Sequence, residues 1–459
     1  MGPEWVAILA LVALFVVGTV LPINMGALAY VAAWFVGMYA LGLDEAEILG
    51  GISASLVLTL IGVTYLFAIA RQNGTVDLIV RKSLGLVGGR VAFIPWVMFA
   101  VTALITSIGA ASPAACAIIG PIALGFAGRY KISPLMMGMF VVHGAQAGGF
   151  SPISIYGTIT NSVMIENGLG DASITIFLSS LVVNLLLAAV LFFALGGTKL
   201  MSMRIAPGDE ALAPSPHHDG PLHRDRTSAT SGTGATPTTG TSPAGTAAAG
   251  TVTTVDPATL GSTRDHVLTI LAFVAVAGVA LGLDRDIGLA AITAAVVLSI
   301  ISPNKYKDTV KQIAWPTVLL VAGVSTYATI LTTAGSPEAV GLWAAGLGAA
   351  AIGALILCYV GGVASAFASS TALLPVIIPI AIPLIASGNI SAGLFVAALA
   401  VSSTIVDVSP FSTNGALMLA NRPDSIGEQT YYRQILTYSV IVTLAGPLLV
   451  WAALVLPGW

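Results

Sequence analysis

Two short polar stretches interrupt apolar segments of this chain, and their residue types are suited to binding an ion. The stretch 406-VDVSPFSTNG-415 combines an aspartate, three hydroxyl side chains and an asparagine with a proline and a glycine that break helices. The stretch 148-GGFSPISIYG-157 carries the same S-P-x-S-x-x-G pattern. Non-helical backbone at membrane depth is tolerated only where it is buried in protein or lines a watery cavity. Both stretches therefore predict a binding site inside a membrane.

Two further breaks are expected at 111–115 and 369–373, so the four breaks form two symmetric pairs, 111–115 with 369–373 and 148–157 with 406–415. The N-terminal ends of broken helices carry partial positive charge and free N–H groups that suit an anion. Their C-terminal ends and unwound carbonyls suit a small cation. Neutral donors at the breaks are predicted to bind the anion: Ser112, Ser151, Ser154, Ser370, Thr371, Ser412, Thr413 and Asn414. Alternatively, such hydroxyls only cap the broken helices or bond back to them.

The apolar centre of these segments contains no Arg or Lys. A dianion held there only by dipoles, hydroxyls and amides would be poorly compensated in a low dielectric. A co-bound cation would remove this problem, so coupling to Na⁺ or H⁺ is predicted. Ser107 and Ser365 lie about one turn before the first break of each half, and their hydroxyl oxygens are candidates for two symmetric cation sites.

Two ionisable residues stand apart from the rest. Asp407 is the one carboxylate predicted deep in an apolar region, where it would bind a cation or carry a proton, unless it caps a helix near water. His143 is the one histidine within a predicted span, and its counterpart in the second half is Val401. It is a candidate proton relay; the alternative is a hydrogen-bonded histidine that serves packing.

The composition is that of a polytopic integral membrane protein. Of the 459 residues, 56% are hydrophobic and 8% charged, whereas a soluble domain carries about 25% charge. Apolar runs long enough to span a bilayer recur along the chain. The first run, 5–20, follows Glu4 without Lys or Arg, so a retained helix is expected rather than a signal peptide. Cys116 and Cys358 fall in apolar segments and indicate neither a disulfide nor a metal framework.

The two halves of the chain repeat one another. Residues 107–157 align with 365–415 without a gap, with 14 identities in 51 positions. We expect an all-α protein with about ten transmembrane helices, two re-entrant hairpins (91–128 and 341–386) and broken helices at the midplane. The predicted parts are a first repeat at 1–198 (scaffold 1–74, arm 75–90, hairpin and transport helices 91–198), a disordered cytoplasmic linker at 199–265, and a second repeat at 266–459 (scaffold 266–334, arm 335–345, hairpin and transport helices 346–459).

The basic residues predict the orientation. With both termini outside, only Arg285 of the 17 Lys and Arg residues falls outside, and basic loops stay cytoplasmic. The first repeat then starts outside and the second inside, so the repeats are inverted. This is the architecture of secondary transporters. The charge rule does not distinguish re-entrant hairpins from pairs of full spans.

The hairpin segments 369-SSTALLPVIIPIA-381 and 111-ASPAACAIIGPIA-123 resemble the Ser-Asn-Thr signatures of the divalent anion/Na⁺ symporters of the ion transporter superfamily. The segments 62–77 and 105–133 are similar to the MatC group of dicarboxylate (malonate) carriers. The resemblance implies substrate contacts from both hairpin tips and both broken helices, with cations beside them. Carried over by position, the Asn and Thr of the first tip fall on Ser112 and Pro113, and those of the second on Ser370 and Thr371. The cation sites assigned in this way add Ser112, Gly148, Ser369, Asp407 and Ser409.

The resemblance implies a secondary carrier for small dicarboxylates, malonate or C4 acids, in a prokaryotic inner membrane. It further implies a homodimer and elevator-type movement, with Na⁺ as a co-transported ion, no cofactor and no nucleic acid. Ser replaces both signature Asn residues and Pro replaces one Thr, so proton coupling and uncoupled transport stay open. The alternatives are a Na⁺/H⁺ antiporter, which should depend on Asp407, and an arsenite-type permease. No H-E-x-x-H motif, paired membrane aspartates or nucleophile with a base indicates an enzyme.

Overall fold

The computed structural model describes residues 2–21, 23–84, 89–204, 262–283, 285–345, 350–367, 370–387 and 390–457. Ser369 of the predicted cation site and most of the predicted linker, 205–261, lie outside the described residues.

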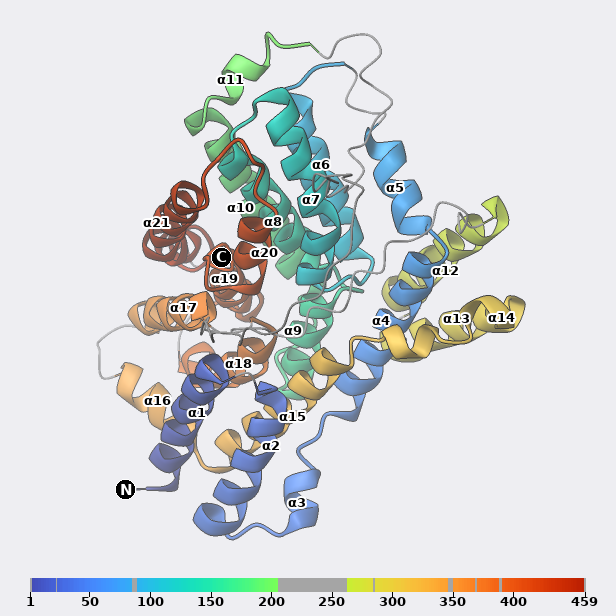
Figure 1. Cartoon of the computed structure of the whole chain (residues 1–459). Helices are drawn as coiled ribbons and strands as arrows, with labels where there is room; N and C mark the ends of the chain where they lie inside the picture. The colour runs from blue at the N-terminus through green and yellow to red at the C-terminus, as the bar shows by residue number, and fades with distance from the viewer. Residues whose placement is uncertain are drawn as a thin grey trace, which may run out of the picture.

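The described chain is helical, and its only β-type pairing is an isolated antiparallel bridge between Arg90 and Arg204 (Figure 1). The helices of the first half are α1 (Pro3–Val20), α2 (Met25–Val36) with a π-helical end (Gly37–Leu41), α3 (Glu45–Leu49), α4 (Ala54–Gln72), α5 (Thr75–Leu84), α6 (Phe93–Ser107), α7 (Ser112–Tyr130), α8 (Pro134–Gly149), α9 (Ile155–Glu166), α10 (Ser173–Ala194) and α11 (Gly197–Leu200). Those of the second half are α12 (Thr263–Gly282), α13 (Ile287–Ile301), α14 (Pro303–Tyr306), a 3-10 turn (Thr309–Gln312), α15 (Trp315–Thr333), α16 (Ser336–Ala345), α17 (Ala350–Phe367), α18 (Ser370–Ser387), α19 (Ala392–Ile405), α20 (Thr413–Ala420) and α21 (Glu428–Leu454).

Seven of the described helical segments are long and apolar enough to cross a membrane, and six shorter apolar helices accompany them. Many side chains on these helices face outward although they are large and apolar, among them Val190 and Phe193 of α10 and Leu444 of α21. Lipid, not water, is the solvent in which such a surface is stable. The predicted all-α polytopic membrane fold is confirmed.

The scaffold helices cross between the halves in two matching pairs. Helix α2 packs on α15, and α13 packs on α4. At the first crossing a Cβ added to Gly323 would lie 2.0 Å from the carbonyl oxygen of Gly26, and at the second a Cβ on Gly62 would lie 2.6 Å from that of Gly288. Small residues allow membrane helices to approach through their backbones. The repeated glycine crossing extends the internal repeat beyond the segment that the sequence alignment covers.

The predicted hairpins each appear as two packed helices, α6 with α7 and α17 with α18. The first break was predicted at 111–115, but it lies at 108–111, because α7 already begins at Ser112. Pro113 occupies the first turn of α7, where a missing N–H costs no helical hydrogen bond. The turn itself is made by Gly109, whose φ of +107° favours glycine. Likewise α18 begins at Ser370, so the expected break at 369–373 was placed too far along the chain.

Candidate functional site

The two unwound segments between helices have the same local structure. Residues 150–154 separate α8 from α9, and residues 406–412 separate α19 from α20. Ser154 and Ser412 are the N-cap residues of α9 and α20, and each accepts a hydrogen bond from the backbone N–H three residues on, Gly157 and Gly415. Their hydroxyls donate back to carbonyls of the break, those of Gly149 and Ser151 for Ser154. For Ser412 the acceptors are the carbonyls of Asp407 and Ser409, at 2.9 and 2.7 Å.

The glycine that ends each S-P-x-S-x-x-G pattern has a packing reason. A Cβ added to Gly157 would lie 2.0 Å from the carbonyl oxygen of Ser151, and a Cβ added to Gly415 would lie 2.0 Å from that of Ser409. Neither carbonyl is the end of a flexible side chain, so the first turn of α9 and of α20 fits only when the side chain is absent. The repeated motif therefore encodes a tight return of the chain onto its own helix start.

A chain of hydrogen bonds joins the tip of the first hairpin, at the start of α7, to the break at 406–412. The side-chain amide of Asn414 donates to Ser112 Oγ at 2.8 Å and to Asp407 Oδ2 at 2.7 Å. All three side chains are buried, and Asp407 is 7% exposed. The amide oxygen of Asn414 has no hydrogen-bond partner among the described residues. Buried polar atoms usually find a partner, so this oxygen is available to a ligand that donates a hydrogen bond or to a cation.

Tyr156 joins both hairpin tips and was not among the residues predicted from the sequence. Tyr156 is 5% exposed, and its hydroxyl lies near the side chains of Ser112 and Thr371. It occupies the position in the first repeat that Asn414 occupies in the second, so the two repeat-related residues meet at Ser112. The alignment of 107–157 with 365–415 already pairs Tyr156 with Asn414. A tyrosine aligned with an asparagine does not by itself indicate that both belong to one site.

At the second hairpin tip, Ser370 is held by its surroundings. Its hydroxyl lies 2.7 Å from that of Ser365 and donates to the carbonyl of Ser403 at 3.1 Å. At the first tip Ser107, the counterpart of Ser365, donates to the Leu104 carbonyl of its own helix, and its own carbonyl accepts from Ser151 Oγ at 2.9 Å. The two hydroxyls predicted for symmetric cation sites, those of Ser107 and Ser365, thus have different partners.

Four other predicted residues make no hydrogen bond to the side chains of Ser112, Asp407 or Asn414 among the described residues. Gly148 lies inside α8, where an added Cβ would lie 1.8 Å from the carbonyl oxygen of Ala103, so its backbone contacts α6. Thr413 is exposed, Pro113 is half-buried, and Ser409 Oγ accepts a bond from the N–H of Phe411 at 3.2 Å. These positions remain predictions as ligand contacts.

His143 is fully buried between α10 and α21. Its Nδ1 lies 2.9 Å from Asn184 Oδ1 and its Nε2 2.6 Å from the Tyr438 hydroxyl. The amide nitrogen of Asn184 donates to the Ser180 carbonyl, which leaves Oδ1 as an acceptor, so Nδ1 carries the proton and Nε2 accepts from Tyr438. Among the described residues no hydrogen bond connects His143 with Asp407. The role of His143 as a proton relay remains a prediction, and its bonds satisfy the packing alternative.

The cluster is made by four elements that are far apart in sequence: the starts of α7 and α18, and the chain around the two breaks. Hydroxyl and amide groups, one carboxylate and helix ends face one another without a Lys or Arg side chain among the residues described above. Such a set can hold a carboxylate through hydrogen bonds and a cation through oxygens. Among the described residues, no three His, Cys, Asp or Glu side chains form a cluster for a tightly held metal.

The fold is that of a multi-pass membrane protein with paired broken helices. Residues 1–149 match the family model of the dicarboxylate carrier protein MatC N-terminus, and residues 284–458 match that of the citrate transporter family. The YdaH transporter of Alcanivorax borkumensis, described as having an unusual topology, superposes with a TM-score of 0.56 at 13% identity over 91% of this chain and 88% of that chain. No curated protein sequence matches the chain.

The predicted resemblance to MatC-type carriers of the ion transporter superfamily is therefore confirmed. The two matched families are carboxylate transporters, so both halves of this multi-pass membrane protein are similar to carboxylate transporters. The families and the structural neighbour are transporters rather than enzymes. The inner-membrane location, the orientation of the termini, the domain boundaries and the homodimer stay predictions.

Proposed function

We propose that the chain is a secondary active transporter of small dicarboxylates, malonate or C4 acids, coupled to Na⁺ or H⁺. The observation that carries this proposal is the convergence of Ser112, Thr371, Tyr156 and Asn414 from both hairpins and both broken helices. Hydroxyl groups from both hairpin tips and from Tyr156 suit a carboxylate, and the unpartnered amide oxygen of Asn414 suits a cation beside it. The match of residues 1–149 to a dicarboxylate carrier supports the same substrate class.

Asp407 supports the coupling to a cation. A buried carboxylate beside an anion site would repel a dianion, because two like charges in a low dielectric repel strongly. A Na⁺ ion or a proton bound at Asp407 neutralises this repulsion. Loading of the cation and loading of the substrate then favour one another, which is the requirement for symport. Asp407 would also serve a Na⁺/H⁺ antiporter, but that activity would leave the paired anion donors without a role.

Elevator-type movement is supported by an asymmetry between equivalent helices. Helix α18 packs on α15 and α16, and α9 packs on α4. Their repeat partners α7 and α20 pack on each other, and within the described parts of the chain neither has comparable packing against a scaffold helix. If α7 and α20 face the cytoplasm, as the basic residues predict, this arrangement is open to the inside. Exchanging the two sets of contacts would open the site to the other side.

The test is uptake of labelled malonate and succinate into proteoliposomes that contain the purified protein. An inward Na⁺ gradient, an inward proton gradient and no gradient are compared. Faster uptake with one gradient supports symport with that ion. If folded protein takes up neither acid but exchanges Na⁺ for H⁺ in the same vesicles, the antiporter alternative replaces this proposal.

A further inference from the structure

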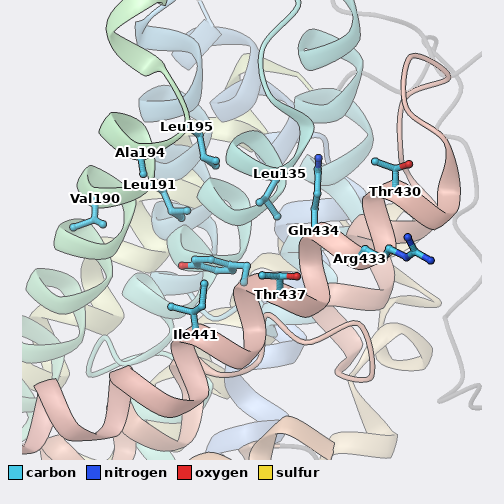
Figure 2. Close-up of a pocket in the computed structure, with 11 residues that line it drawn as sticks. Leu135, Val190, Leu191, Ala194, Leu195, Thr430, Arg433, Gln434, Thr437 and Ile441 are labelled. Atoms are coloured by element: carbon cyan, nitrogen blue, oxygen red, sulfur yellow. The ribbon is translucent and has the colours of Figure 1, made fainter.

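A groove separates the end of α10 from the beginning of α21, and Leu135 of α8 lines it between them (Figure 2). Its volume is about 560 Å³. Its apolar wall is formed by Leu135, Val190, Leu191, Ala194 and Leu195. The groove is separate from the cluster around Asn414 and Tyr156, because none of the residues of that cluster lines it.

The opposite wall changes from polar to apolar along a single helix. Thr430, Arg433, Gln434 and Thr437 line the groove from the first turns of α21, and Ile441 lines it one turn deeper. The polar end coincides with the end of the groove that the basic residues predict to be cytoplasmic. An amphipathic molecule whose charged end lies at the interface and whose chain lies in the membrane fits this gradient.

The charge of the groove favours an anion at its polar end. Arg433 is exposed, and no carboxylate lines the groove. Arg422, which precedes α21, pairs with Glu428 at 3.4 Å, whereas Arg433 makes no ion pair within the described part of the chain. The side-chain oxygen of Gln434 is buried and has no hydrogen-bond partner among the described residues. That acceptor requires a donor, for example a hydroxyl group.

From this lining we propose that the groove binds an anionic phospholipid whose head group carries hydroxyls, as in phosphatidylglycerol. The phosphate lies against Arg433, a head-group hydroxyl donates to Gln434, and an acyl chain lies along Leu191, Leu195 and Ile441. The cytoplasmic leaflet is rich in anionic lipid, and one basic residue near its surface contributes about 1 kcal/mol.

The bound lipid also reaches the interior of the molecule. Tyr438 lines the groove, and its hydroxyl makes the hydrogen bond to His143 on α8, the helix that ends at the break 150–154. An acyl chain packed on Tyr438 therefore stabilises the contact between α21 and α8. The lipid is expected to raise the thermal stability of the protein as well as to bind it.

Binding is measured by native mass spectrometry of delipidated protein in an uncharged detergent, titrated with dioleoylphosphatidylglycerol or dioleoylphosphatidylcholine. Wild type should prefer the glycerol lipid. Arg433→Gln should weaken the binding of the glycerol lipid about five-fold, as expected for the loss of one interfacial charge, and leave the binding of the choline lipid unchanged. Ala194→Trp, which fills the groove, should weaken binding of both lipids.

Two matched variants serve as controls. Lys307→Gln removes an exposed charge outside the groove, and Val182→Trp adds the same ring to an exposed position elsewhere on α10, so both should bind like wild type. Melting temperatures without lipid verify that all four variants are folded. Equal binding of the two lipids by wild type, or unchanged binding by Arg433→Gln, would overturn the proposal. So would a loss of equal size in Lys307→Gln.

Discussion

The pair α9 and α18 and the pair α7 and α20 are built from equivalent parts of the two repeats, yet their surroundings differ. In α18, residues 370–379 are all buried. In the equivalent part of α7, several residues, such as Pro113 and Ile118, are only half-buried. In the same way Ile155 at the start of α9 is 4% exposed, but its counterpart Thr413 on α20 is exposed. Similar sequences thus occupy two environments, as alternating access between two sides of a membrane requires.

The largest effect is expected from the glycines that both pairs share. Gly157→Ala and Gly415→Ala should each abolish transport, because the new methyl group would lie 2.0 Å from a backbone carbonyl. Overpacking in a fixed environment costs about 1–3 kcal/mol or more. The yield of folded protein should fall more for Gly157→Ala, whose helix is packed against α4 and α18.

Folded yield is measured by fluorescence-detected size-exclusion chromatography. Gly278→Ala is the control, because an added Cβ there has no neighbour within 4 Å. Normal transport by either of the first two variants would contradict the role assigned to the tight return at the breaks.

Asp407→Asn should reduce coupled uptake about ten- to a hundredfold, the equivalent of a lost charge-assisted interaction of about 1.5–3 kcal/mol. The variant keeps the size of the side chain but removes the charge that the cation requires. Uptake should no longer respond to the ion gradient. Asp308→Asn, which changes an exposed aspartate paired with Lys311, is the control. If uptake by Asp407→Asn still depended fully on the ion gradient, the coupling cation would have to bind at another residue.

Labelling of introduced cysteines tests the two environments directly. Thr413→Cys on α20 should react with a membrane-impermeant thiol reagent added to the cytoplasmic side, whereas Ile155→Cys on α9 should react slowly from both sides. Cys116 and Cys358 are buried, so background labelling should be low. Reaction of both cysteines at the same rate from one side would contradict the inward-open interpretation. Labelling of Thr413→Cys from the outside alone would show that the protein has the opposite orientation in the membrane from the one predicted.

Tyr156→Phe should have the smallest effect, about three- to tenfold weaker apparent affinity for substrate, since it removes one hydroxyl worth about 0.5–1.5 kcal/mol. The ring remains and keeps its packing, so the maximal rate should change less than the affinity. Tyr65→Phe is the matched control, because its hydroxyl bonds to Ser299 at 2.9 Å within the scaffold. An unchanged apparent affinity for substrate in Tyr156→Phe would show that the Tyr156 hydroxyl does not contribute to substrate binding.

The sequence by itself determined the membrane class, the internal repeat and the four breaks, because hydropathy and Ser-Pro and glycine signals act locally along the chain. It also identified Ser112, Asp407 and Asn414 as unusual residues, since polar groups at membrane depth are costly wherever they lie. The break at the first hairpin tip was placed about three residues late, because Pro113 begins a helix rather than ending one.

Only the tertiary structure decided which of these residues meet. Asn414 reaches Ser112 across 302 positions of the chain, and Tyr156 lies between the two hairpin tips. The glycine crossings of the scaffold and the difference between α9 and α20 also depend on how helices pack. Local sequence patterns fix where a helix begins and which face is apolar, but partners far along the chain are selected by packing of the whole fold.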